Sequence, residues 1–147
     1  MKKLFALVLW ALICPQLVLA QPLNKLCYTT DGLNCVPAVQ ASNSVAINTA
    51  AASTVQIVAL SSGKNIFVTS WNVIAAGTTN FTLVYGTGTN CGTGTTALTG
   101  AYPLIAQAGI SVGHGAGVVL VVPRGNALCV TNSAAIQASG SVSYAQF

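Results

Sequence analysis

The sequence predicts an all-β protein: a single β-sandwich of jelly-roll type, with about eight or nine antiparallel strands, that follows a cleaved signal peptide. Three observations lead to this prediction. After residue 20, short runs rich in β-branched residues alternate with glycine, proline, asparagine and serine. Several of these runs alternate apolar and polar residues, as a strand with one solvent-exposed face requires. No segment after residue 20 shows sustained helical periodicity.

The clearest strand lies at the C-terminal end of the chain. Ile136, Ala138, Val142 and Tyr144 share one parity there, and polar residues fill most of the other. Gly140 interrupts the apolar side, which indicates either a bulge or a close approach of another backbone. One face of this strand is therefore expected to lie in the core.

Two earlier segments give strong strand signals. Residues 79–85 repeat the alternation, with aromatic or aliphatic residues predicted to face inward and polar residues outward. Residues 66–75 form a longer candidate strand, with Phe67, Trp71 and Val73 predicted to share one face.

The remaining strands are shorter. Residues 118–122 are continuously apolar, so both faces of that strand are expected to be buried. A turn at 123–126 then leads into a strand at 127–132. Weaker strand signals occur at 45–47, 54–60, 102–106 and 109–112.

The N-terminus has the parts of a secretory signal peptide. Two lysines precede an apolar run, and Val18-Leu19-Ala20 provides small residues for cleavage before Gln21. A retained membrane anchor is the alternative, but a span needs about 20 apolar residues and this run is shorter and interrupted. We therefore expect a signal peptide at 1–20, an N-terminal arm with a small disulfide loop at 21–44 and the sandwich at 45–147. The expected location is secreted or periplasmic, with no stable membrane anchor after cleavage.

The mature chain carries very little charge. Its charged residues are Lys25, Lys64, Arg124 and Asp31, which give a formal charge of 3 − 1 = +2. Three scattered cations form no basic patch, so we expect no nucleic-acid partner. So few charges suit a surface that is partly covered in an assembly, or one kept soluble by Thr, Ser and Asn. The sequence leaves both explanations open.

Four cysteines follow the signal peptide, and an even count in an exported chain favours disulfide bonds. We predict the pairs Cys27–Cys35 and Cys91–Cys129, although two other connectivities are formally open. Zinc binding is disfavoured because the chain has no Cys-x-x-Cys pair and a single histidine, His114.

Residues 86–100 are rich in glycine and threonine, carry no charge and hold Cys91 near their centre. Phosphate-binding loops need a following helix and usually a lysine, and neither is expected here. The segment is therefore predicted to be a loop at the tip of the sandwich, tethered through Cys91 to Cys129. Its polar side chains form a candidate contact surface: Thr87, Thr89, Asn90, Thr93 and Thr95.

Residues that carry chemistry are too few for a recognisable active site. Gly109 to Gly113 matches the Gly-x-Ser-x-Gly elbow around Ser111, with His114 beside it, but an elbow requires a following helix. One Asp and no Glu after the signal peptide exclude paired-carboxylate chemistry and a carboxylate-rich calcium site. We therefore expect a protein that is not an enzyme, with no catalytic residues, no metal and no cofactor.

Three aromatic residues, Trp71, Tyr85 and Tyr102, would suit stacking on sugar rings if they were exposed on one face. Aromatic residues on the strands of a small sandwich more often fill the core, which is the favoured interpretation here. Asn80-Phe81-Thr82 is a glycosylation sequon, which matters only where the host modifies it.

Four segments carry a family resemblance: Ala75 to Thr78, Tyr85 to Gly100, Val122 to Val130 and Ser141 to Phe147. Over residues 64–147 the chain resembles a poorly characterised group of small proteins encoded in tailed-phage and prophage-like genomes. This resemblance implies a virion-associated or phage-encoded β-sandwich, and it implies no reaction and no functional residue.

Two functions are therefore expected. The first is a non-enzymatic structural or surface-binding β-sandwich, exported or virion-associated, that acts through an assembly or adhesion interface. Its partner would be another copy of the chain, or a surface glycan or protein. The alternative is a secreted carbohydrate-binding module or a fimbria-like adhesin subunit. Exposure of the three aromatic residues on one face would favour the alternative, and their burial would count against it.

Overall fold

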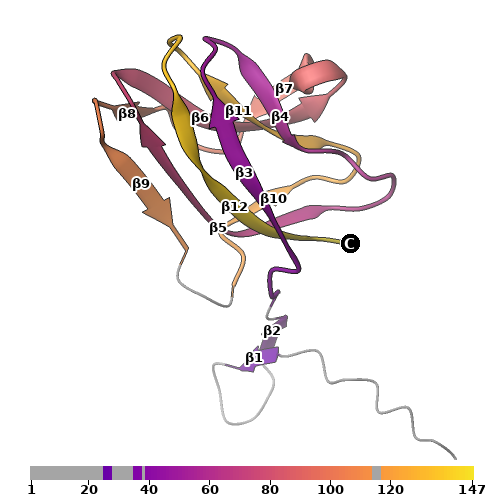
Figure 1. Cartoon of the computed structure of the whole chain (residues 1–147). Helices are drawn as coiled ribbons and strands as arrows, with labels where there is room; N and C mark the ends of the chain where they lie inside the picture. The colour runs from indigo at the N-terminus through magenta and orange to yellow at the C-terminus, as the bar shows by residue number, and fades with distance from the viewer. Residues whose placement is uncertain (1–24, 28–34, 38, 114–116) are drawn as a thin grey trace, which may run out of the picture.

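The computed structural model describes residues 25–27, 35–37, 39–113 and 117–147. Within this part of the chain the protein is all-β, as predicted, and two antiparallel sheets pack face to face as a β-sandwich (Figure 1). Each of the two sheets has five strands, so the sandwich contains ten strands rather than eight or nine.

A separate small hairpin precedes the sandwich in the sequence. Its strands β1 (Lys25–Cys27) and β2 (Cys35–Pro37) pair antiparallel, with Cys27 opposite Cys35 in the register. The predicted signal peptide at 1–20 and the side chains of the predicted Cys27–Cys35 disulfide lie outside the described residues.

The first sheet of the sandwich has the strand order β10-β5-β12-β3, and β9 pairs with β5 on the same edge as β10. The C-terminal strand β12 is therefore central, between β5 and β3. The strands are β3 (Asn43–Thr49), β5 (Ile66–Ala75), β9 (Gly109–Val112), β10 (Leu120–Val122) and β12 (Ala138–Gln146).

The second sheet has the order β4-β11-β6-β7, and β8 pairs with β6 on the same edge as β7. A short 3-10 turn, η1 (Thr89–Cys91), connects β6 to β7. The strands are β4 (Thr54–Val58), β6 (Thr79–Thr87), β7 (Thr93–Ala97), β8 (Tyr102–Leu104) and β11 (Ala127–Asn132).

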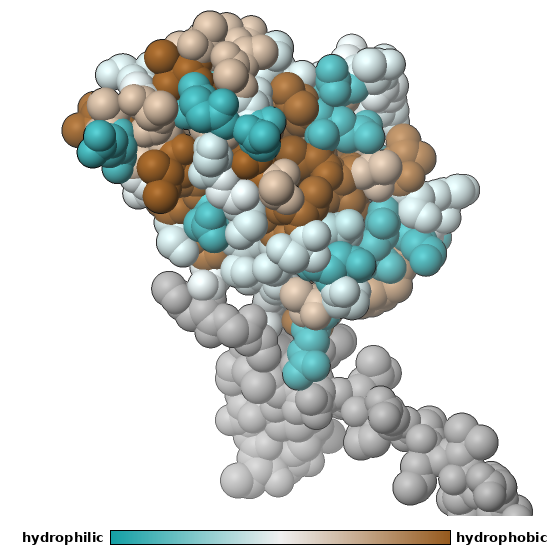
Figure 2. Space-filling model, in the orientation of Figure 1, coloured by the Kyte–Doolittle hydropathy of each residue, from teal (hydrophilic) through white to brown (hydrophobic). Residues whose placement is uncertain are grey.

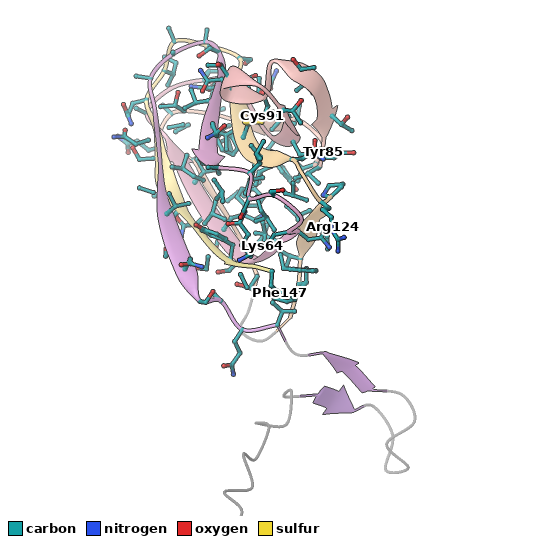
Figure 3. The ribbon with its side chains drawn as sticks, turned by 90° about the vertical axis from the view of Figure 1, so that its right-hand side faces the viewer. Lys64, Tyr85, Cys91, Arg124 and Phe147 are labelled. Carbon is teal, nitrogen blue, oxygen red and sulfur yellow. A yellow bond between two sulfur atoms is a disulfide. The ribbon has the colours of Figure 1, made fainter. Side chains whose placement is uncertain are left out.

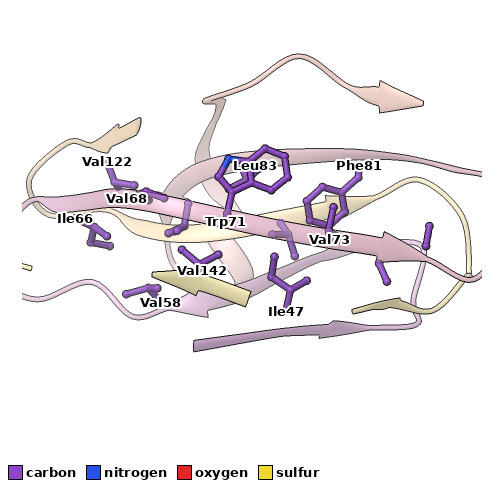
Figure 4. Packing of buried hydrophobic residues seen from close by; sticks show 14 of the residues in the cluster. Ile47, Val58, Ile66, Val68, Trp71, Val73, Phe81, Leu83, Val122 and Val142 are labelled. Atoms are coloured by element: carbon purple, nitrogen blue, oxygen red, sulfur yellow. The ribbon is translucent and has the colours of Figure 1, made fainter. Parts of the chain in front are cut away.

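The core consists of aliphatic and aromatic side chains that project inward from both sheets (Figure 4). Trp71 of β5 and Phe81 of β6 face each other across it, with ring centroids 6.2 Å apart. The predicted alternation of 79–85 is confirmed, because Phe81 and Leu83 are fully buried. Removal of this apolar surface from water is the main force that holds the two sheets together.

A β-bulge in β5 changes which residues face the core. The register pairs Ser143 with Ser70 but Tyr144 with Val68, so Thr69 is an extra residue on β5. A bulge shifts the side-chain parity, because two residues of one strand lie opposite one residue of its neighbour. Val68 and Trp71 are therefore both buried, whereas Phe67 faces outward and is half-buried. The prediction that Phe67 shares a face with Trp71 is wrong for this reason.

The apolar run at 118–122 is also more exposed than predicted. Only Val122 is fully buried, while Val119 and Val121 are 37% and 45% exposed. The strand within this run, β10, pairs with β5 alone and lies at the edge of its sheet, so one of its faces is open. A continuous apolar run indicates burial on both faces only where the strand is central.

At Gly140 the backbones of β12 and β5 lie close together. A Cβ atom added at this position would lie 2.0 Å from the carbonyl oxygen of Asn72 and 2.9 Å from the Cα of Val73. The glycine therefore marks a close backbone approach, which is one of the two alternatives that the sequence left open.

Candidate functional site

The glycine- and threonine-rich segment is a turn followed by a strand, rather than a loop throughout. The chain leaves β6 at Thr87, makes the turn η1 and returns as β7, antiparallel to β6. Asn90 and Cys91 have φ angles of 52° and 57°, in the left-handed region, which produces the tight reversal. Sequence reasoning missed β7, although the run of threonines after Gly92 is compatible with a strand.

The segment is attached to the outer face of the second sheet by the predicted Cys91–Cys129 disulfide. Both cysteines are fully buried, and they form a small second core with Val84 and Ala127. On β11 the neighbours of Cys129, Leu128 and Val130, belong to the main core. Cys129 therefore points to the opposite face, because successive side chains alternate along a strand. The turn consequently covers part of the outer face of the sheet.

Glycine at position 86 allows this close packing. A Cβ atom there would lie 2.9 Å from the carbonyl oxygen of Thr93 and 3.0 Å from that of Cys91. On the other side of the turn, the backbone N–H of Gln56 donates a hydrogen bond of 3.1 Å to Oδ1 of Asn90. The segment thus spans the outer face of the sheet from β6 to the edge strand β4.

The candidate contact surface is largely accessible. Thr89, Asn90, Thr93 and Thr95 are exposed, and Thr87 is half-buried. All five residues of β7 are exposed as well. The hydroxyl of Thr95 donates a hydrogen bond to the carbonyl oxygen of Cys91, and this bond stabilises the turn. The structure therefore presents an uncharged, hydroxyl-rich surface that is held in place by a disulfide.

The serine motif lies in a strand. Ser111 is in β9, opposite Asn72 of β5, and its partner in the motif, His114, lies outside the described residues. Gly113, with a φ of 102°, follows at a point where a Cβ atom would lie 2.4 Å from the carbonyl oxygen of Thr69. Packing against β5 therefore explains this glycine without an elbow. Within the described part of the chain, no group of three or more His, Cys, Asp or Glu side chains is arranged to hold a metal ion.

The three aromatic residues form no exposed platform. Trp71 is buried, and its ring lies 5.5 Å from the ring of Tyr102. Tyr85 and Tyr102 are half-buried and pack against the main core. This arrangement agrees with the interpretation that they fill the core.

An open groove of about 400 Å³ on the outer face of the first sheet was not foreseen. Residues of β5 and β12 line it, among them Asn72, Ile74, Ser139 and Gly140. The amide of Asn72 is hydrogen-bonded to Ser141, and Nε2 of Gln137 to Asn48 and Ser139. These amides are therefore partly occupied within the protein.

Asn80 of the sequon is exposed at the start of β6. Its backbone N–H donates to the hydroxyl of Ser133 at 2.8 Å, and its carbonyl accepts from the backbone N–H of Ser133. Its backbone is thus fixed by Ser133, while the residue itself faces solvent.

Comparison with known proteins yields no match to a family model, to a curated protein or to a solved structure. Among the described residues, no helix is both long enough and apolar enough to cross a membrane.

Proposed function

We propose that the protein is a non-enzymatic structural or surface-binding β-sandwich, exported or virion-associated, that acts through an assembly or adhesion interface. The observation that carries this proposal is the hydroxyl-rich surface of η1 and β7, which a buried disulfide fixes to the sheet. A rigid surface loses little conformational entropy on binding, so it suits a permanent contact.

We further propose that the sandwich is a jelly roll. Four strands in the first half of the sandwich pair with the strands of the second half in reverse order: β3 with β12, β4 with β11, β5 with β9 and β10, and β6 with β7 and β8. A long antiparallel hairpin has this pairing. The additional pairs β5–β12 and β6–β11 arise when such a hairpin is rolled into two sheets. Jelly rolls occur in viral capsid and lectin domains, although the fold alone does not define a function.

Export is supported by two separate features. The sequence begins with the parts of a signal peptide. The Cys91–Cys129 disulfide is of the kind that persists in oxidising compartments. A secreted or periplasmic location agrees with both, and a virion association rests on the family resemblance.

An assembly role is favoured over glycan binding. Proteins usually protect an edge strand with charged residues or with proline. The exposed edge strand β7 has neither. Such an edge suits a further strand or another protein surface. Glycan recognition by stacking would require aromatic rings in solvent, and Trp71, Tyr85 and Tyr102 all pack against the core.

The oligomeric state tests this proposal. We expect the mature protein to form oligomers at high concentration in gel filtration with multi-angle light scattering. Substitution of Thr89→Arg with Thr93→Arg would place two charges on the contact surface and shift the mass towards the monomer, because burial of unpaired charges is costly.

The matched control adds the same charge elsewhere. Thr78 and Ser62 are exposed in turns outside the segment, so Thr78→Arg with Ser62→Arg should leave the mass distribution unchanged. A strictly monomeric wild-type protein at high concentration would contradict the assembly role.

A further inference from the structure

Three segments that are distant in the sequence meet at one end of the sandwich. The backbone N–H of Asn65 donates to the carbonyl oxygen of Phe147 at 2.9 Å, and the N–H of Phe147 donates back at 3.2 Å. The N–H of Gly125 donates to the carbonyl oxygen of Lys64 at 3.4 Å. Lys64, Arg124 and Phe147 consequently lie near one another, on the side away from Cys91 (Figure 3).

This end holds all the charged side chains of the sandwich. Lys64 and Arg124 are the only charged residues between 39 and 147, and both are exposed. The only carboxylate side chain in the whole sequence belongs to Asp31, in the arm. The two cations therefore have no acidic side chain within the sandwich to pair with.

Exposed apolar side chains gather on the same segments. Five of the seven large apolar residues that are exposed in the described part lie there: Leu60, Val118, Val119, Val121 and Phe147. Phe147 is 60% exposed and stacks on Phe67 at 4.5 Å. Val121 lies opposite Phe67 in the register of β10 and β5. We call the surface formed by Leu60, Lys64, Val121, Arg124 and Phe147 the basic end.

Charge determines which partner fits the basic end. A second copy of the sandwich offers no carboxylate side chain on any face, and a symmetric contact between two basic ends would bring four cations together. An anionic partner that also accepts apolar side chains therefore complements the basic end best. An anionic lipid surface has both properties, since phosphate groups attract Lys and Arg while Phe, Leu and Val enter the acyl boundary.

We propose that the basic end binds reversibly to the surface of an anionic lipid bilayer. The lysine and arginine side chains reach the headgroups while their aliphatic stems lie beside the apolar residues. This site is separate from the hydroxyl-rich surface of η1 and β7, so the proposal does not depend on an assembly role.

The test is co-sedimentation of the mature protein with vesicles of phosphatidylcholine, with and without phosphatidylglycerol, at low salt. We expect binding that requires phosphatidylglycerol and weakens as salt is added. Lys64→Gln and Arg124→Gln should each lower the partition coefficient about fivefold, and Lys64→Arg should preserve it. Phe147→Ser should lower it roughly tenfold, through lost apolar burial.

The matched control is Ile74→Ser. Ile74 is 58% exposed and lies at the opposite end of β5, so this variant should bind vesicles as the wild-type protein does. Equal loss in Ile74→Ser and Phe147→Ser would overturn the proposal, as would equal binding to neutral vesicles or no binding at all. Lys64- and Arg124-dependent capture of a single-stranded oligonucleotide, without vesicle binding, would assign a nucleic acid instead and would also overturn it.

Discussion

Gly140 and Gly86 are required by packing and not by an unusual backbone angle. At both positions the carbonyl oxygen of a neighbouring segment occupies the space that a side chain would need. Gly140 allows β12 to lie against β5 in the middle of the first sheet, and Gly86 allows the turn η1 to lie against the second. Neither contact can be relieved by a side-chain rotation, because the obstructing atoms belong to the backbone.

Replacement of Gly140 by alanine should therefore destabilise the protein strongly. The added Cβ would lie 2.0 Å from the carbonyl oxygen of Asn72, so β5 and β12 would have to separate. We expect a loss of about 3 kcal/mol in the free energy of unfolding, the upper part of the range for an overpacked site. Urea unfolding followed by Trp71 fluorescence measures this change.

Gly100→Ala is the matched control. A Cβ atom at Gly100 would have no heavy atom within 4 Å, and its φ is not positive, so the unfolding free energy should change by less than about 0.5 kcal/mol. Equal stability of the Gly140→Ala and Gly100→Ala variants would contradict the packing role of Gly140.

The bulge at Thr69 could not be predicted from the sequence. An extra residue in a strand has no compositional mark, and Thr69 fits the strand pattern as well as its neighbours do. Its hydroxyl donates to the carbonyl oxygen of Ser143 at 3.1 Å, a contact across the sheet that depends on the register. The parity of Phe67 relative to Trp71 therefore follows from the pairing of β5 with β12.

Among the elements, β5, β6, β11 and β12 were predictable from sequence because each has residues that must face the core. Strand β7 has no such residues, since all five are exposed. It exists because β6 offers a free edge and the disulfide holds η1 beside it. The same disulfide holds the segment against the outer face of the second sheet. Apolar periodicity cannot reveal an element whose stability comes from its neighbours.

The Cys91–Cys129 disulfide should stabilise the whole sandwich and β7 in particular. It closes a loop with a sequence separation of 38, for which chain entropy predicts a contribution of about 3–4 kcal/mol. Replacement of both cysteines by alanine should lower the free energy of unfolding by roughly that amount. In this variant the amide protons of residues 93–97 should exchange faster than those of β6, as measured by hydrogen exchange with mass spectrometry.

The control for this experiment is the double variant Cys27→Ala with Cys35→Ala. These cysteines lie in the hairpin before the sandwich, so their loss should leave the unfolding of the sandwich unchanged. Non-reducing peptide mapping of the wild-type protein should give a Cys91–Cys129 peptide. A Cys27–Cys91 peptide would show that the predicted connectivity is wrong.

At the scale of the whole molecule, the two sheets meet along a side formed by their edge strands β3 and β4. Apolar residues gather between these strands on the face shown in Figure 2, with polar residues around them. The sequence predicted two sheets but not which strands are neighbours. Strand pairing between distant segments depends on the packing of the complete core, and the convergence of Lys64, Arg124 and Phe147 depends on it in turn.

Because the first and last strands of the sandwich are neighbours, the molecule should fold slowly and only when β12 is complete. Strand β12 lies between β3 and β5 and contributes the buried residues Ala138 and Val142. A chain that lacks residues 138–146 should therefore fail to bury Trp71, whereas a chain that starts at residue 39 should keep its unfolding free energy. Trp71 is 2% exposed and is the only tryptophan after the predicted signal peptide, so its emission reports burial directly. Stopped-flow refolding of the full mature chain should take milliseconds to seconds, as in other folds dominated by non-local pairing. Native-like Trp71 emission in the chain without β12 would show that the first and last strands are not needed together.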